Sequence, residues 1–163
     1  VSYNELAQLC GLDSKTVEKY VVLLEQSYVI FRLNSFSRNL RNELKTSKKI
    51  YFYDNGIRNA LIANFNQIEG RADRGALWEN FLISERKKFL EYNRLWGNSW
   101  FWRTKEQKEI DWVEERDGKI IGYEFKWNPD QKVKIPRLFL DSYENSDFRV
   151  IHRDNCDSFL LEY

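Results

Sequence analysis

The dipeptide Asp117-Gly118, between two segments typical of strands, is the feature that most constrains the fold of this chain. Asp-Gly is a strong signal for a two-residue type I′ turn, which joins two antiparallel strands. If these two residues form the turn, Arg116 faces Lys119, and the register of both strands follows residue by residue. The sequence therefore predicts strands over residues 109–114 and 119–127, paired as a hairpin.

This register places two carboxylates opposite each other, Asp111 and Glu124, and also places Glu109 opposite Lys126 on the same face. The other face is apolar and is expected to face the core: Ile110, Trp112, Ile121, Tyr123, Phe125 and Trp127. Carboxylates directly opposite each other have Cβ atoms about 5 Å apart and destabilise the sheet unless they are neutralised. A divalent cation that prefers oxygen ligands, Mg²⁺ or Mn²⁺, would neutralise them. The alternative is a surface hairpin with a Glu109–Lys126 ion pair and solvated carboxylates.

Lys126 lies two residues from Glu124 on that face and is placed to position a water molecule beside such a cation. A metal at this point would polarise a phosphodiester and lower the pKa of the attacking water. The hairpin therefore predicts phosphodiester hydrolysis, with Asp111 and Glu124 as metal ligands.

The first 56 residues have the pattern of a helix-turn-helix followed by two strands. A helix over residues 3–9 ends before Gly11, and Asp13 is the expected N-cap of a second helix. That helix presents one apolar face: Val17, Tyr20, Val21 and Leu24. Strand patterns at 28–33 and 49–53 enclose a basic loop, and together these elements predict a partial winged helix. The alternative is an ordinary pair of helices packed on a neighbour.

Residues 31–49 carry six basic side chains and one acidic side chain, a net charge of +5. This basic segment coincides with the predicted wing, so contact with double-stranded DNA is expected there. The candidate contacts are Arg32, Arg38, Arg41, Lys45 and Lys48, together with Lys15 of the second helix. A solvated face or a protein-interaction module is the alternative. Lys105, Gln107 and Lys108 are expected in a solvated turn, with contact to phosphates as the alternative.

The second half alternates helix and strand patterns, which predicts an α/β or mixed-sheet (α+β) domain. The expected elements are a helix at 75–92, strands at 99–103, 109–114 and 119–127, a helix at 131–142, and strands at 148–151 and 159–161. The predicted organisation is a winged module over residues 1–56, a connecting segment over 57–74 and an α/β domain over 75–163.

Asp111 followed after a hairpin by Glu124-Phe125-Lys126 resembles the D…ExK signature of the PD-(D/E)xK nuclease superfamily. Glu79, in the segment 76–81, matches the glutamate that this superfamily often carries on the preceding helix. The resemblance implies a restriction-endonuclease-like mixed sheet flanked by helices. It further implies that Asp111, Glu124 and Glu79 hold Mg²⁺ or Mn²⁺ and that Lys126 is catalytic.

Segments along nearly the whole chain resemble the DUF4143 domain: 5–7, 15–20, 23–25, 48–56, 75–80 and 109–112. This resemblance implies the C-terminal part of an ATPase-linked prokaryotic protein. The chain contains neither a phosphate-binding Gly-x-x-x-x-Gly-Lys-Ser/Thr loop nor a methionine, so ATP would bind only in an upstream domain that is absent here. The implied function is a Mg²⁺-dependent DNA nuclease with a DNA-binding wing. The alternative is a non-catalytic nucleic-acid-binding, protein-interaction or self-associating module that regulates the ATPase.

Composition excludes several other classes of protein. The 163 residues have a net charge of +1, which excludes a wholly basic nucleic-acid coat, and 42% are apolar, which excludes a disordered chain. The chain lacks an apolar run of about 18 residues and the pattern of a signal peptide, so no membrane association is expected. Two widely spaced cysteines, Cys10 and Cys156, favour a cytoplasmic location, and a single histidine, His152, excludes sites that need several imidazole ligands.

Replacing Arg38, Arg41 and Lys45 together by alanine should weaken binding to duplex DNA and flatten its dependence on salt. With fewer phosphate contacts, fewer counterions are released from the DNA on binding. Fluorescence anisotropy at several salt concentrations measures both effects. An unchanged affinity at low salt would exclude the wing as a DNA contact.

Overall fold

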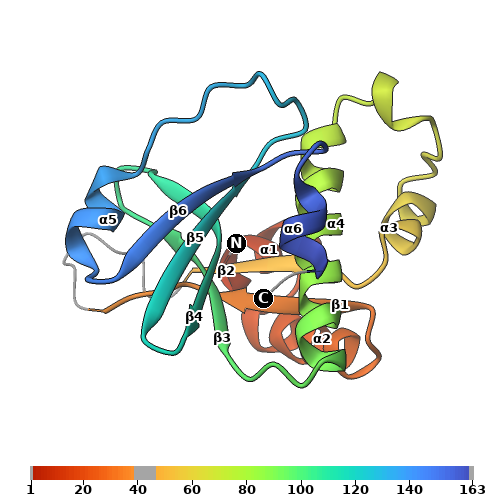
Figure 1. Cartoon of the computed structure of the whole chain (residues 1–163). Helices are drawn as coiled ribbons and strands as arrows, with labels where there is room; N and C mark the ends of the chain where they lie inside the picture. Colours follow the sequence, from red (N-terminus) through yellow and green to blue (C-terminus); the bar gives the residue numbers. More distant parts are fainter. Residues whose placement is uncertain (1, 39–46, 162–163) are drawn as a thin grey trace.

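The computed structural model describes residues 2–38 and 47–161 and shows a mixed α/β fold with two sheets (Figure 1). Strands β1 (Ile30–Asn34) and β2 (Lys48–Phe52) pair antiparallel as a two-stranded sheet. Strands β3 (Asn98–Arg103), β4 (Glu109–Arg116), β5 (Lys119–Phe125) and β6 (Ser146–Ile151) form the second sheet in that order. Strand β6 runs parallel to β5, and the other neighbours are antiparallel.

Two short helices precede the first sheet, as the sequence predicts. Helix α1 (Tyr3–Cys10) begins with a capping box between Ser2 and Glu5 and ends at Gly11, whose φ of 64° is left-handed. Helix α2 (Ser14–Gln26) begins at Asp13, whose carboxylate accepts a hydrogen bond from the Thr16 amide. The predicted apolar face is only half right, because Val17 and Val21 are buried whereas Tyr20 and Leu24 are exposed.

From the Asp-Gly turn to the pair Trp112–Tyr123, the hairpin of β4 and β5 has the predicted register, and the expected pairs Asp111–Glu124 and Glu109–Lys126 lie beyond the paired residues. Asp117 and Gly118 have φ angles of 51° and 77°, and Arg116 pairs with Lys119, Val113 with Gly122 and Trp112 with Tyr123. The turn residues adopt positive φ because a type I′ turn requires it at both central positions.

A β-bulge in β4 changes the predicted faces of this strand. Trp100 of β3 pairs with Val113, but Trp102 pairs with Ile110, so one extra residue lies in β4 between these points. A bulge reverses the alternation of side chains. Ile110 therefore joins the apolar cluster of Val113 and α5, whereas Trp112 lies in the cluster on the other face. The prediction that Ile110 and Trp112 share one face is wrong.

Helices cover both faces of the four-stranded sheet. Helices α4 (Arg74–Tyr92) and α6 (Cys156–Leu161) lie on one face, and α5 (Arg137–Ser142) lies on the other (Figure 1). A buried ion pair fixes α4: Arg86 donates to both carboxylate oxygens of Glu114 at 2.7 and 2.9 Å, and also to the Phe159 carbonyl at 2.6 Å.

Two expected elements of the second half differ in the structure. The helix expected over 131–142 begins only at Arg137, because Pro136 has no amide hydrogen and disfavours helical backbone in the residue before it. The strand expected at 159–161 is the helix α6, since a short apolar run does not distinguish strand from buried helix. Residues between the sheets form helix α3 (Asn55–Leu61) and a 3₁₀ turn, Ile68–Gly70.

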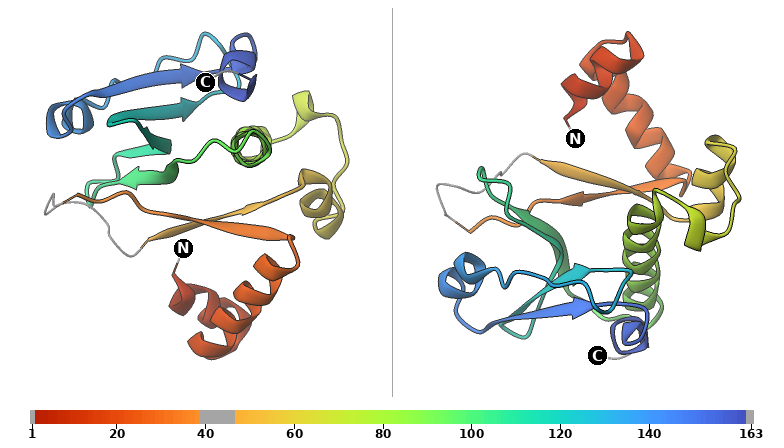
Figure 2. Two further views of the ribbon diagram at one scale, coloured as in Figure 1. Left: turned by 60° about the horizontal axis from the view of Figure 1, so that its bottom comes forward. Right: turned by 90° about the horizontal axis from the view of Figure 1, so that it is seen from above.

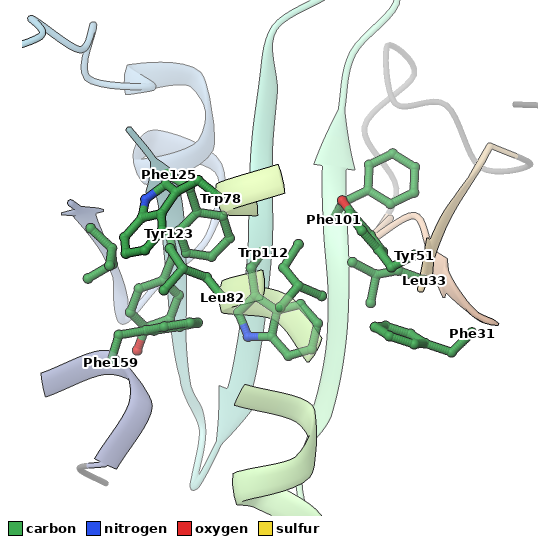
Figure 3. Packing of buried hydrophobic residues seen from close by; sticks show 12 residues of the cluster. Phe31, Leu33, Tyr51, Trp78, Leu82, Phe101, Trp112, Tyr123, Phe125 and Phe159 are labelled. Carbon is green, nitrogen blue, oxygen red and sulfur yellow. The ribbon is translucent and has the colours of Figure 1, made fainter. Parts of the chain in front are cut away.

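The β1–β2 hairpin packs into the core of the second half. Phe31, Leu33 and Tyr51 belong to the same buried cluster as Leu82 of α4 and Phe101 of β3 (Figure 3). Seen end-on in the left panel of Figure 2, α4 lies between this hairpin and α6. The two predicted strands therefore form, but one face of the pair is buried against α4 and β3.

Asn80 of α4 holds the edge of the hairpin through its side-chain amide. Its Oδ1 accepts from the Phe52 amide at 2.8 Å, and its Nδ2 donates to the Phe52 carbonyl at 2.9 Å. Asn80 is 5% exposed, so both bonds are shielded from water. A further contact joins the sheets, an isolated parallel bridge between Ser35 and Phe101.

In the part of the chain that the structure describes, none of the helices is both long enough and apolar enough to cross a membrane.

Asn80→Ala should lower the free energy of unfolding by about 2–3 kcal/mol, because it leaves the part-buried amide and carbonyl of Phe52 without their Asn80 partner. Chemical denaturation measures the loss. The matched control is Asn93→Ala, at the exposed C-cap of the same helix, for which a loss of less than about 1 kcal/mol is expected. Equal losses for the two variants would contradict the role assigned to Asn80.

Candidate functional site

The ammonium group of Lys49 lies among three carboxylates from two other elements. Its Nζ is 2.9 Å from Glu79 of α4, 2.5 Å from Glu109 of β4 and 3.2 Å from Asp111 of β4. Lys49 belongs to β2, so the cluster joins the N-terminal hairpin to the second half. The aromatic ring of Phe101 lies 5.6 Å from the same ammonium and adds a cation–π contact. We call Lys49, Glu79, Glu109 and Asp111 the acidic cluster.

Strand alternation brings a second β2 side chain to this cluster. Tyr51 lies two residues from Lys49, on the same face of β2, and its hydroxyl donates to Glu79 Oε1 at 2.6 Å. Glu79 is therefore held by both the lysine and the tyrosine. Burial, followed by the charge of Glu79, raises the pKa of Tyr51 well above its ordinary value, so the phenol stays protonated and acts as a donor.

Asp111 is the most buried carboxylate of the cluster, 8% exposed as a residue. The bulge turns its side chain toward α4, where one oxygen contacts Lys49 and the other accepts from the Phe125 amide at 3.0 Å. Burial raises the pKa of Asp111 to about 7; Glu79 and Glu124 also raise it, whereas Lys49 and the Phe125 amide lower it.

The charge state of Lys49 follows from its neighbours. Burial by itself would lower the pKa of Lys49, but the negative charges of Asp111, Glu79 and Glu109 outweigh this and raise the pKa above its ordinary value. Lys49 is therefore a permanent cation near neutral pH, and one ammonium is shared by three acids.

Glu124 and Lys126 form a separate pair beside the acidic cluster. Lys126 Nζ lies 2.7 Å from Glu124 Oε1, and this contact, together with the nearby acids, raises the pKa of Lys126 although burial opposes it. Glu124 acts on Asp111 through its charge, while the hydrogen bonds of Asp111 go to Lys49 and Phe125. The alternative Glu109–Lys126 pair does not form, because Glu109 contacts Lys49 and Arg103.

The donor set of the acidic cluster is that of a hard cation, but its spacing suits an ammonium. Within residues 2–38 and 47–161, no group of three or more His, Cys, Asp and Glu side chains is arranged to hold a metal. The oxygens lie 2.5–3.2 Å from the Lys49 nitrogen, farther than the roughly 2.0–2.1 Å of Mg²⁺ ligands. A metal at this point would have to displace Lys49 and draw the carboxylates inward.

The predicted DNA contacts are scattered over the N-terminal elements. Arg32 contacts Glu25 and the Tyr3 hydroxyl, and Lys48 lies over the Tyr3 ring. Of the other candidate DNA contacts, Arg38 contacts Glu115 and Lys15 is exposed on α2. Arg41 and Lys45 fall outside the described residues. Lys49, the last residue of the basic segment, is directed into the acidic cluster and does not extend the basic surface.

Three residues of the site were not among the candidates from sequence: Lys49, Tyr51 and Glu109 as a site carboxylate. Glu109 carried a usable signal, because it lies two residues from Asp111 in the same strand. For Lys49 and Tyr51 the signal was only their spacing of two within β2. Their encounter with Glu79 depends on how the hairpin packs against α4.

Comparison with known families divides the chain in two. Residues 74–156, half of the chain, match the model of a domain of unknown function, DUF4143. The chain belongs to the DUF4143 family. Residues 1–68 match the model of a different domain of unknown function, DUF8612. The DUF4143 resemblance is thus confirmed for the second half, whereas the N-terminal segments assigned to it fall under the second model.

Two mycobacterial proteins are similar in sequence to this DUF4143 protein. They are the uncharacterized proteins Mb2031c of Mycobacterium bovis and Rv2008c of Mycobacterium tuberculosis, each 28% identical over 124 residues. The matched part is 75% of this chain but 27% of either relative, so the chain spans about a quarter of their length. No solved structure matches the chain.

Asp111→Asn should change how stability depends on pH. Because the folded state raises the pKa of Asp111 from 3.8 to about 7, it binds this proton more tightly than the unfolded chain does. The resulting stabilisation is fully present below about pH 4 and is lost as pH rises through 7. The parent therefore loses stability as the pH rises from 5 to 8, whereas Asp111→Asn does not. The free energy of unfolding of the variant minus that of the parent should increase by about 1–3 kcal/mol over this range.

Urea denaturation at pH 5, 6, 7 and 8 measures this difference. Asp154→Asn, at an exposed carboxylate, is the control and should follow the parent at every pH. A constant difference between Asp111→Asn and the parent would show that Asp111 titrates normally.

Proposed function

We propose that this DUF4143 protein hydrolyses phosphodiester bonds in DNA with Mg²⁺ or Mn²⁺. The observation that carries the proposal is the convergence of three carboxylates, Glu79, Glu109 and Asp111, on one cation, with Glu124 and Lys126 beside them. The proposal is supported by the order of elements around these residues, a helix with Glu79 followed by strands with Asp111 and Glu124, which is the order that the resemblance to the PD-(D/E)xK superfamily implies.

Lys49 serves as a stand-in for the metal in this argument. Its ammonium occupies the point toward which the carboxylates are directed, so the donor set accepts a positive charge there. We assign Asp111 and Glu79, which contact this point together with Glu109, as residues that would hold the ion; Glu124, the further ligand that the sequence resemblance implies, lies beside them and contacts Lys126. When bound, the ion would supply polarisation of the scissile phosphate and a water of lowered pKa.

Lys126 has a defined role in this proposal. Its contact with Glu124 and its raised pKa keep it protonated near neutral pH, so it can donate hydrogen bonds but does not accept a proton. Lys126 therefore positions the attacking water or stabilises negative charge developing on the phosphate. Glu124 fixes the direction of the Lys126 side chain through their 2.7 Å contact.

The context of this activity is also part of the proposal. We propose, from the DUF4143 resemblance, that an ATPase domain in the same polypeptide binds ATP upstream of this chain. A cytoplasmic location fits a protein that acts on DNA. The helix-turn-helix and the basic segment would contribute contacts to double-stranded DNA, and self-association is a further property to be measured.

One observation favours a second candidate, a non-catalytic module that binds nucleic acid or another protein and regulates the ATPase. Lys49 already neutralises part of the acidic cluster and ties it to β2 and α4. Such a cluster stabilises the junction between the two matched domains without any metal. The two candidates differ in whether a divalent cation can replace the lysine.

Calorimetric titration of Mn²⁺ into the parent, Asp111→Asn and Lys49→Ala separates the two candidates. If the cluster is a metal site, Lys49→Ala should bind Mn²⁺ at least about 10-fold more tightly than the parent, because it removes the competing cation, and Asp111→Asn should not bind. Lys126→Ala should keep Mn²⁺ binding and lose cleavage of plasmid DNA by about 100-fold or more.

The matched control is Lys87→Ala, which removes a lysine of α4 that pairs with the exposed Glu91. It should bind Mn²⁺ as the parent does. If neither the parent nor Lys49→Ala binds Mn²⁺, the metal site is excluded and the regulatory module becomes the better assignment.

A further inference from the structure

A cleft of about 840 Å³ lies beside the acidic cluster, between the end of β5 and residues 131–138. Glu109, Glu124 and Lys126 line one side of it. The opposite side is the segment before and at the start of α5, which has no regular structure from Gln131 to Pro136. The cleft therefore opens onto Glu124 and Lys126 of the proposed site and onto Glu109 of the acidic cluster, whereas Asp111 and Glu79 are not part of its lining.

The walls of this cleft carry an excess of positive charge. Lys108, Lys132, Lys134 and Arg137 line it and are exposed. Within the described residues, none of these four forms an ion pair with a carboxylate. The two acids of the lining are already paired, Glu124 with Lys126 and Glu109 with Lys49 and Arg103. Four cations are therefore available to a ligand with several negative charges.

The same cleft has an apolar component. Leu138 and Phe148 line it and are half-buried, and Ile135 lines it with 60% of its surface exposed. Proteins that bind single-stranded nucleic acid combine a positively charged groove with aromatic side chains on which unstacked bases stack, and Phe148 supplies an aromatic ring in this lining. A duplex keeps its base faces stacked inside and presents only phosphates and groove edges.

We propose that this cleft binds single-stranded DNA, with phosphates on Lys108, Lys132, Lys134 and Arg137 and bases against Ile135, Leu138 and Phe148. This inference rests on the proposed function for the choice of DNA and specifies its substrate as a strand separated from its partner. The volume lies within the roughly 300–1,000 Å³ of ordinary ligand pockets, which accommodates a few nucleotides but not a duplex.

The position of the cleft explains how such a strand would reach the site. Lys126 and Glu124 line the cleft, so a phosphodiester lying along it passes their side chains. The proposed surface for duplex DNA, on the N-terminal elements, is then separate from the proposed surface for single-stranded DNA, in this cleft. Variants of one surface should leave the binding of the other ligand unchanged.

The test measures binding of a fluorescein-labelled 12-nucleotide oligothymidylate by anisotropy, in EDTA so that cleavage plays no part. The triple variant Lys132→Ala, Lys134→Ala, Arg137→Ala should bind about 10-fold or more weakly than the parent, with a salt dependence shallower by about 2 in log–log slope. The control triple Lys19→Ala, Arg94→Ala, Arg153→Ala removes the same charge from exposed positions outside the cleft and should bind as the parent does.

Several outcomes would overturn the proposal. Equal weakening in both triple variants would indicate general electrostatic attraction, and unchanged affinity in the cleft variant would exclude the cleft. Tighter binding of a 12-base-pair duplex than of the single strand, or equal competition by polyglutamate, would show a different ligand. Because the assay needs neither metal nor hydrolysis, its result is separate from the Mn²⁺ titration, which decides the nuclease assignment.

Discussion

The Lys49 ammonium, shared by Glu79, Glu109 and Asp111, is the interaction on which the arrangement of this protein depends. It joins β2, α4 and β4, three elements that come from different parts of the chain. Three acids so close together would repel one another, and burying them without a cation would be costly. The lysine therefore allows the helix, the hairpin and the sheet to meet. Asn80, the residue after Glu79 in α4, fixes the same junction through two hydrogen bonds to the backbone of Phe52.

The chain matches two domain models, but one continuous core extends across this junction. The boundary between the matches falls between residues 68 and 74, but Phe31 and Tyr51 pack in one cluster with Leu82 and Phe101. The β1–β2 hairpin is thus part of the wall of the candidate site. Strand β2 connects the N-terminal elements to the acidic cluster, because Lys49 and Tyr51 both contact Glu79.

The same geometry is compatible with a catalytic and a regulatory role because an ammonium and a divalent cation require similar oxygen ligands at different distances. The cleft of Lys132, Lys134 and Arg137 adds a feature that a structural ion cluster does not need, namely cations that have no carboxylate partner among residues 2–38 and 47–161. The proposed strand binding and the proposed metal-dependent chemistry are therefore assigned to different residues of this surface. A module that has lost one can retain the other.

Sequence alone determined the local elements and the hairpin register. The Asp117-Gly118 turn fixed the pairing of Arg116 with Lys119, Asp13 fixed the start of α2, and the pairing of Trp112 with Tyr123 followed. These features depend on backbone preferences and near neighbours, which a single sequence encodes directly. Only the tertiary structure decided the bulge that directs Asp111 toward α4, the helical form of residues 156–161, and the meeting of Lys49 with Glu79. Each of these results from packing between segments far apart in sequence, where burial and charge pairing override the local alternation of side chains.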